Sequence, residues 1–126
     1  MGEAVTTNGF RKRLARHFFN GQSLPPITQM AFGDGGHKDD RTPQSPDPDQ
    51  VALNHECLRK DLINLVQEDD YSVTGTGRIA KSELIGINLS EAGLLDEAGS
   101  LMAFKNFSPK IKDGDEEYDF TIKLKF

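Results

Sequence analysis

The sequence has no tryptophan, and Cys57 is its single cysteine. One cysteine excludes an intrachain disulfide, so we expect folding in a reducing compartment and a thiol that packs as a small apolar side chain. Long apolar runs are also missing, because no window approaches the roughly 20 apolar residues of a membrane span. Residues 1–21 are too polar for the apolar centre of a signal peptide. We therefore expect a protein made in the cytoplasm, with no signal peptide and no membrane insertion.

Positive charge is scarce as well. The chain holds 15 Lys and Arg against 20 Asp and Glu, which gives a formal net charge of -5. This balance argues against general binding to nucleic-acid backbones or anionic membranes. The chain has 126 residues, of which 36% are hydrophobic, so it has the size of one domain with a compact core. We predict a single domain over residues 1–126.

The segment 7–21 is predicted to form a helix, because large apolar side chains recur at every fourth position. These side chains are Phe10, Leu14 and Phe18. Thr7 or Asn8 can cap the start of the helix, and Gly21 fits just past its end. The cations of the segment are Arg11, Lys12, Arg13 and Arg16. A solvated helix face explains them most simply, and an electrostatic contact with a neighbouring subunit is the alternative.

A strand and a long loop are predicted next. Pro25 and Pro26 break the helix and lead into Ile27–Phe32, whose apolar and β-branched residues suit a short strand. Residues 33–50 contain three Gly, three Pro, five Asp and no large apolar residue. Such a composition cannot pack a core, so we predict one long loop that is exposed and mobile.

Residues 56–126 are predicted to be mainly antiparallel β-structure. Their first part is ambiguous, because its leucine spacing also fits a helix. We favour one turn of helix near Val51–Asn54, followed by a strand over about residues 56–67.

Strand patterns also cover residues 72–77 and 78–88. Acidic turn residues and a glycine join two apolar runs, which predicts a hairpin over Leu94–Leu101 with a second strand that ends at Phe107. Apolar and polar residues alternate strictly over Tyr118–Phe126, as in a strand with one face in the core. These elements indicate an α+β fold, with an N-terminal helix packed on an antiparallel β-sheet or small β-sandwich and one long exposed loop.

Sequence patterns that would indicate a phosphate-binding, metal-binding or catalytic site are weak. Gly33–Gly36 lacks the Lys-Ser/Thr pair of a phosphate-binding loop, so a structural turn is favoured over phosphate binding. His37 and its neighbours Asp34, Asp39 and Asp40 lack the spacing of a zinc or calcium site, so a solvated acidic loop is favoured. In a strand, His55 and Cys57 would share a face without Glu56, which disfavours a thiol active site. We therefore predict no catalytic, cofactor or metal site.

Glu91 is the charge that most needs an explanation. It lies among apolar residues in a segment that should be well packed, so its carboxylate requires a partner. Arg59 and Arg78 are the obvious cations, and we predict an ion pair that ties two strands together. Asp34 in the glycine-rich turn and the four cations of the helix are further candidates for structural or interface contacts.

Three stretches match one known pattern in order and spacing. Thr6–Gly9 reads T-x-x-G at the predicted helix start, and Asn88–Ala103 contains E-x-G-L-x-D-x-x-G-x-L-x-A. Between them lie Ile27–Gly36, Gln50–Leu53, Glu56 and Arg59. Together these segments resemble the N-terminal anchor domain of phage tail-collar fibre proteins.

The resemblance implies a structural, non-enzymatic domain that fixes a tail fibre to the baseplate of a contractile phage tail, prophage particle or tailocin. It also implies a homotrimer, carried in the particle, whose host recognition is performed by a distal region. Because the sequence stops at Phe126, we expect either a truncated fibre or a short component that works with a separate receptor-binding chain. The alternative is a soluble binding module that recognises a cell-surface carbohydrate or other ligand through residues 33–50.

Overall fold

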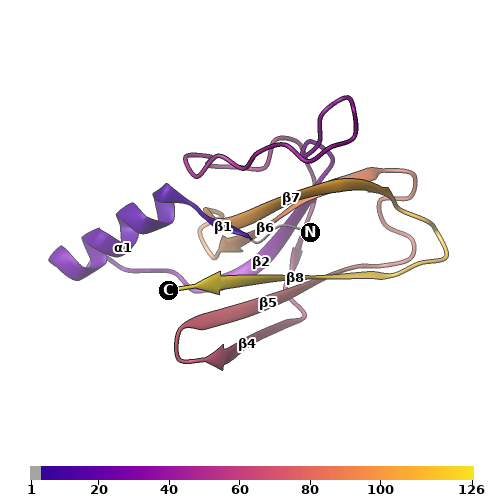
Figure 1. The fold of residues 1–126 in the computed structure, drawn as a ribbon. Coiled ribbons are helices and arrows are strands. Elements are labelled where there is room, and N and C mark those ends of the chain that lie inside the picture. Colours follow the sequence, from indigo (N-terminus) through magenta and orange to yellow (C-terminus); the bar gives the residue numbers. More distant parts are fainter. Residues whose placement is uncertain (1–3) are drawn as a thin grey trace.

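The structure is a computed structural model that describes residues 4–126, so the first three residues of the predicted domain lie outside the described part. It is rich in β-structure, with one short helix among the described residues. The elements are β1 (Val5–Thr6), α1 (Asn8–Asn20), β2 (Ile27–Gly33), β3 (Glu56–Asp61), β4 (Asn64–Asp69), β5 (Ser72–Ile79), β6 (Asn88–Asp96), β7 (Leu101–Ile111) and β8 (Tyr118–Lys125). The strands form a five-stranded sheet in the order β1-β7-β6-β2-β3 and a three-stranded sheet in the order β4-β5-β8. All pairings are antiparallel, and the sheets face each other as a small sandwich (Figure 1).

The main core fills the space between the two sheets. Phe120 of β8 lies 5.5 Å, between ring centroids, from both Phe32 of β2 and Phe107 of β7. Along β8 the buried residues alternate with exposed ones, which confirms the strand predicted from the period of two. Gly77 in β5 lets the sheets approach, because a Cβ there would lie 2.7 Å from Met30 Sδ.

A second, smaller core lies on the other face of the five-stranded sheet. Its buried residues are Ala31, Leu53, Leu95, Leu101 and Phe104. Leu53 belongs to the segment 34–55, which joins β2 to β3 and lies outside the sheets over β7 and β6 (Figure 1). Neither a helix nor a strand forms in this segment, so the helical turn predicted at Val51–Asn54 is wrong.

The strand predicted over residues 56–67 is in fact two strands in different sheets. The backbone N–H of Leu62 donates to Thr28 O of β2, whereas the next N–H, of Ile63, donates to Thr76 O of β5. Two adjacent residues thus carry the chain from one sheet to the other. The local pattern of residues 56–67 does not reveal such a change, because it does not specify which sheet each part of the segment joins.

Two further boundaries differ from the prediction. The strand expected over residues 78–88 ends at Ile79, because turns occupy the positions before β6, with Leu84 at a φ of 53°. In contrast, β7 continues past Phe107 to Ile111. Its pairing with β6 is irregular around Pro109, since the register shifts between Leu89 and Glu91. A proline, which has no N–H, is tolerated in a strand at such an irregularity.

Helix α1 has the predicted caps. Thr7 Oγ1 accepts from Phe10 N, and Gly21 ends the helix at a φ of 74°. Phe10 is buried in the main core, but Phe18 and Phe19 near the end of the helix are 78% and 90% exposed. The helix therefore packs on the sheets through its first turns, as predicted for an N-terminal helix packed on the sheet, and its end projects beyond them (Figure 1). Over residues 4–126, no helix has the length and apolar character needed to cross a membrane.

Candidate functional site

Glu91 in β6 is the centre of a buried polar network. Its side chain has no exposed surface. Oε2 accepts from the backbone N–H groups of Gly35 and His55, and Oε1 accepts from that of Asn54, each at 2.8 Å. One carboxylate thus binds both ends of the segment 34–55 to the sheet.

The ion pair predicted between Glu91 and an arginine is therefore wrong. Arg59 bonds Glu56 on its own strand, at 2.8 and 3.1 Å. Arg78 bonds Asp119 at 2.8 and 3.0 Å, and its guanidinium lowers the pKa of that carboxyl. Backbone amides satisfy the buried carboxylate instead, and amides leave no mark in the sequence by which this partner could be found.

Glycines allow the segment to lie this close to β6. A Cβ at Gly36 would lie 2.2 Å from Ser90 O, and one at Gly33 would lie 2.3 Å from His55 O. The N–H groups of Gly35 and Gly36 donate to Glu91 and to Ser90 Oγ. These amides bind the protein itself, which agrees with the structural turn favoured for Gly33–Gly36.

A second set of contacts holds the middle of the segment. Nδ1 of His37 lies 2.8 Å from Ser90 Oγ, and Asn106 Nδ2 donates to Gln44 O at 3.1 Å. The tip between them is a small exposed turn in which Lys38 N donates to Thr42 O. The segment 34–55 is thus attached to the sheet at several points, with an exposed tip.

Three side chains with metal-binding atoms meet where β2 ends and β3 begins. Asp34 Oδ1 lies 2.5 Å from His55 Nδ1, and Cys57 Sγ lies 3.7 Å from the same nitrogen. Partial burial, and then the nearby carboxylate of Asp34, raise the pKa of the Cys57 thiol. The sequence patterns paired Asp34 with His37, and His55 with Cys57, but they could not join the three because the β2–β3 register is a long-range property.

The four cations of α1 are not equivalent. Arg13 forms an ion pair with the fully buried Asp96 at the end of β6. Arg11, Lys12 and Arg16 are exposed on the helix. Lys12, Arg13 and Arg16 line a hollow of about 370 Å³ together with the exposed Val51. The helix thus presents positive charge beside apolar surface.

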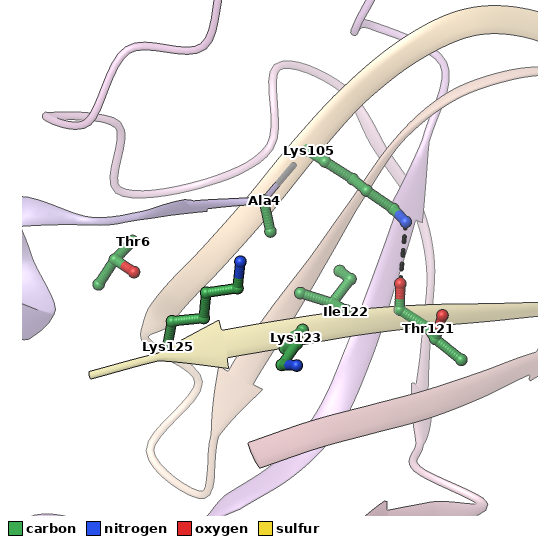
Figure 2. A pocket seen from close by; sticks show the side chains of 7 residues that line it. All are labelled: Ala4, Thr6, Lys105, Thr121, Ile122, Lys123 and Lys125. Atoms are coloured by element: carbon green, nitrogen blue, oxygen red, sulfur yellow. Dashed lines mark hydrogen bonds between the residues drawn. The ribbon is translucent and has the colours of Figure 1, made fainter. Parts of the chain in front are cut away.

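Another basic hollow, of about 220 Å³, lies between β1 and β8 (Figure 2). Its lining residues are Ala4, Thr6, Lys105, Thr121, Ile122, Lys123 and Lys125. Lys105 Nζ donates to Thr121 O at 2.8 Å and so joins the two sheets. Burial, with a smaller effect of Lys110, lowers the pKa of Lys105. Because the Lys105–Thr121 hydrogen bond crosses this hollow, the hollow forms part of the edge between the two sheets.

Comparison with known proteins yields one informative similarity. No protein-family model matches the sequence. The chain is 34% identical over 111 residues to the "Probable tail fiber protein" of Escherichia phage P2. The matched residues make up 86% of this chain. The aligned part is 16% of the phage protein's length. The similarity supports a relationship to phage tail fibres.

Proposed function

We propose that this chain is a non-catalytic structural domain of the tail-collar type, which anchors a tail fibre to the baseplate of a contractile phage tail or phage-derived particle. The observation that carries the proposal is the similarity to the phage P2 protein across 86% of the chain. The resemblance of Ile27–Gly36 and Asn88–Ala103 to tail-collar anchor domains supports the finer assignment. The protein then resides in the particle and does its work through protein contacts.

Helix α1 is the element best suited to the docking. Phe18 and Phe19 are largely exposed, and Arg11, Lys12 and Arg16 lie on the same short helix. Exposed aromatic side chains beside cations are typical of the anchors by which a helix enters an apolar groove with an acidic rim. In this proposal the groove belongs to a baseplate protein. Transfer of the two rings from water into it would favour the complex by about 25 cal/mol for each Å² of apolar area.

The domain acts as a homotrimer in this proposal. A sandwich with such a small core gains stability from contacts with sister subunits. The phage P2 relative is much longer than the matched part, so we assign host recognition to a distal fibre region or to a separate receptor-binding chain.

Coexpression with the baseplate proteins of the same phage or prophage tests the proposal. Light scattering after size exclusion should give the mass of a trimer and of its complex with one baseplate protein. The Phe18→Ala/Phe19→Ala variant should lose that complex while its circular dichroism spectrum and unfolding midpoint stay unchanged. Ile85→Ala serves as the matched control, since Ile85 is an exposed apolar residue of the turn before β6.

The outcome also separates the alternative function. A monomer that binds none of the baseplate proteins would overturn the anchor proposal. If that monomer bound a glycan, and variants within residues 33–50 abolished the binding, a carbohydrate-recognising module would replace it.

A further inference from the structure

Asp34, His55 and Cys57 bring together one carboxylate, one imidazole and one thiol. Their ligand atoms all lie within 4.8 Å of one another. Calcium and magnesium prefer oxygen ligands alone, whereas nitrogen and sulfur together suit zinc and similar transition-metal ions. The donor set therefore points to a borderline or soft divalent ion.

One of these distances already matches what such an ion requires. Around a tetrahedral zinc ion, ligand atoms at about 2.0–2.3 Å from the metal are about 3.3–3.7 Å apart. Cys57 Sγ and His55 Nδ1 already lie 3.7 Å apart. Asp34 Oδ1 is hydrogen-bonded to the same nitrogen at 2.5 Å, so an ion entering between them has to widen this contact by about 1 Å.

The backbone around the ligands is held in place by other contacts. Glu91 binds the N–H groups of His55 and of Gly35, the residue after Asp34. Asp34 N donates to His55 O at 3.2 Å. Cys57 lies in β3, which is paired with β2 on the neighbouring residues. Ligands held in this way lose little conformational entropy on binding an ion.

We propose that Asp34, His55 and Cys57 form a binding site for a zinc-like divalent transition-metal ion. The side chain of His55 is 72% exposed, so the ion has access from solvent and a fourth position for water. On binding, the Cys57 thiol releases its proton to solvent and the thiolate coordinates the metal. Asp34 and His55 are the first and last residues of the segment 34–55, so the ion joins the two ends of that segment.

Cobalt is the direct probe, because a Co²⁺–thiolate bond absorbs in the near ultraviolet. The tag-free chain, reduced with a phosphine, is titrated with Co²⁺ and then with Zn²⁺. We expect a charge-transfer band that saturates at one Co²⁺ per chain, together with the visible bands of tetrahedral cobalt. Zn²⁺ should abolish both sets of bands, and it should raise the unfolding midpoint because it binds the folded state selectively.

Single-residue variants decide whether the three ligands act together. Cys57→Ser should remove the charge-transfer band, and His55→Ala and Asp34→Asn should each weaken Co²⁺ affinity at least about tenfold. His17→Ala is the matched control, since His17 lies on α1 away from the cluster, and it should leave the titration unchanged. Circular dichroism confirms that every variant is folded.

Two results would overturn the proposal. One is a folded wild-type chain that shows no charge-transfer band at millimolar Co²⁺. The other is a band whose affinity is the same in His55→Ala and Asp34→Asn as in the wild type, which would mean that the thiol alone binds cobalt. Both readouts are independent of baseplate binding, so the anchor function and the metal site succeed or fail separately.

Discussion

Helix α1 and the segment 34–55 lie against the same five-stranded sheet, but they are held there in opposite ways. The helix is attached through its first turns, by the cap residue Thr7, the buried Phe10 and the Arg13–Asp96 ion pair. The segment 34–55 has no regular secondary structure, yet hydrogen bonds and Leu53 attach it at several points along its length.

The difference follows from where each backbone finds its hydrogen bonds. A helix satisfies its own N–H and C=O groups between its ends, so it can project into solvent without partners. An irregular segment has to find hydrogen-bond partners elsewhere, and here the sheet provides Ser90 and Glu91 as acceptors and Asn106 as a donor. Buried polar residues in a β-sheet can therefore serve a neighbouring segment rather than a ligand.

Removing the central acceptor should have the largest effect. Glu91→Ala leaves three backbone N–H groups without their acceptor and creates a cavity, so we expect a loss of about 3–5 kcal/mol in unfolding free energy. Urea unfolding measures the loss, and hydrogen exchange should show the amides of Gly35, Asn54 and His55 exposed. Glu97→Ala, in the exposed turn after β6, is the control. Equal stability of the two variants would contradict the role assigned to Glu91.

Leu53→Ala tests the apolar attachment of the segment 34–55. Leu53 is buried against the outer face of the sheet, so its truncation should cost about 2–4 kcal/mol. Val51→Ala, two residues away and exposed, should change the unfolding free energy by less than about 0.5 kcal/mol. A Leu53→Ala variant as stable as Val51→Ala in urea would show that the hydrogen bonds alone hold the segment.

Thr7→Val should loosen the helix more than the sheets. The variant removes the cap to Phe10 N and the hydrogen bond to Leu101 O, at an expected cost of about 1–2 kcal/mol. Amide exchange should accelerate within α1 while β6 and β7 stay protected. Thr6→Val, on the preceding strand, is the matched control. Uniformly faster exchange across the whole domain would mean that the helix is not a separate unit.

Protonation of two paired carboxylates outside both regions should have the smallest effect. The Lys60 ammonium lowers the pKa of Glu83, and the Arg78 guanidinium lowers that of Asp119. The unfolded chain then binds more protons, so the stabilisation is complete above about pH 5 and is lost as the pH falls through the lowered pKa values. When the unfolding midpoint is measured as a function of pH, Glu83→Gln and Lys60→Met should each reduce its fall at acid pH. An unchanged fall in both would contradict the pairing.

Local patterns identified the elements whose determinants are local. The caps of α1, the hairpin around Glu97–Gly99 and the alternation along β8 follow from spacing within a few residues. The change of sheet at Leu62 and the amide partners of Glu91 depend on which distant strands pair. No local period encodes that pairing. The cluster of Asp34, His55 and Cys57 was missed for the same reason.

Thr7 also makes the placement of α1 depend on a late part of the chain. Its Oγ1 donates to a carbonyl 94 positions later in the chain, at Leu101, while it caps the helix that begins beside it. Synthesis proceeds from the N-terminus, so α1 leaves the ribosome long before the strand that fixes its direction. The direction of the helix, and with it the position of its aromatic end, is therefore fixed only after β7 has been synthesised. Contacts with other proteins that depend on this position can form only when most of the domain has folded.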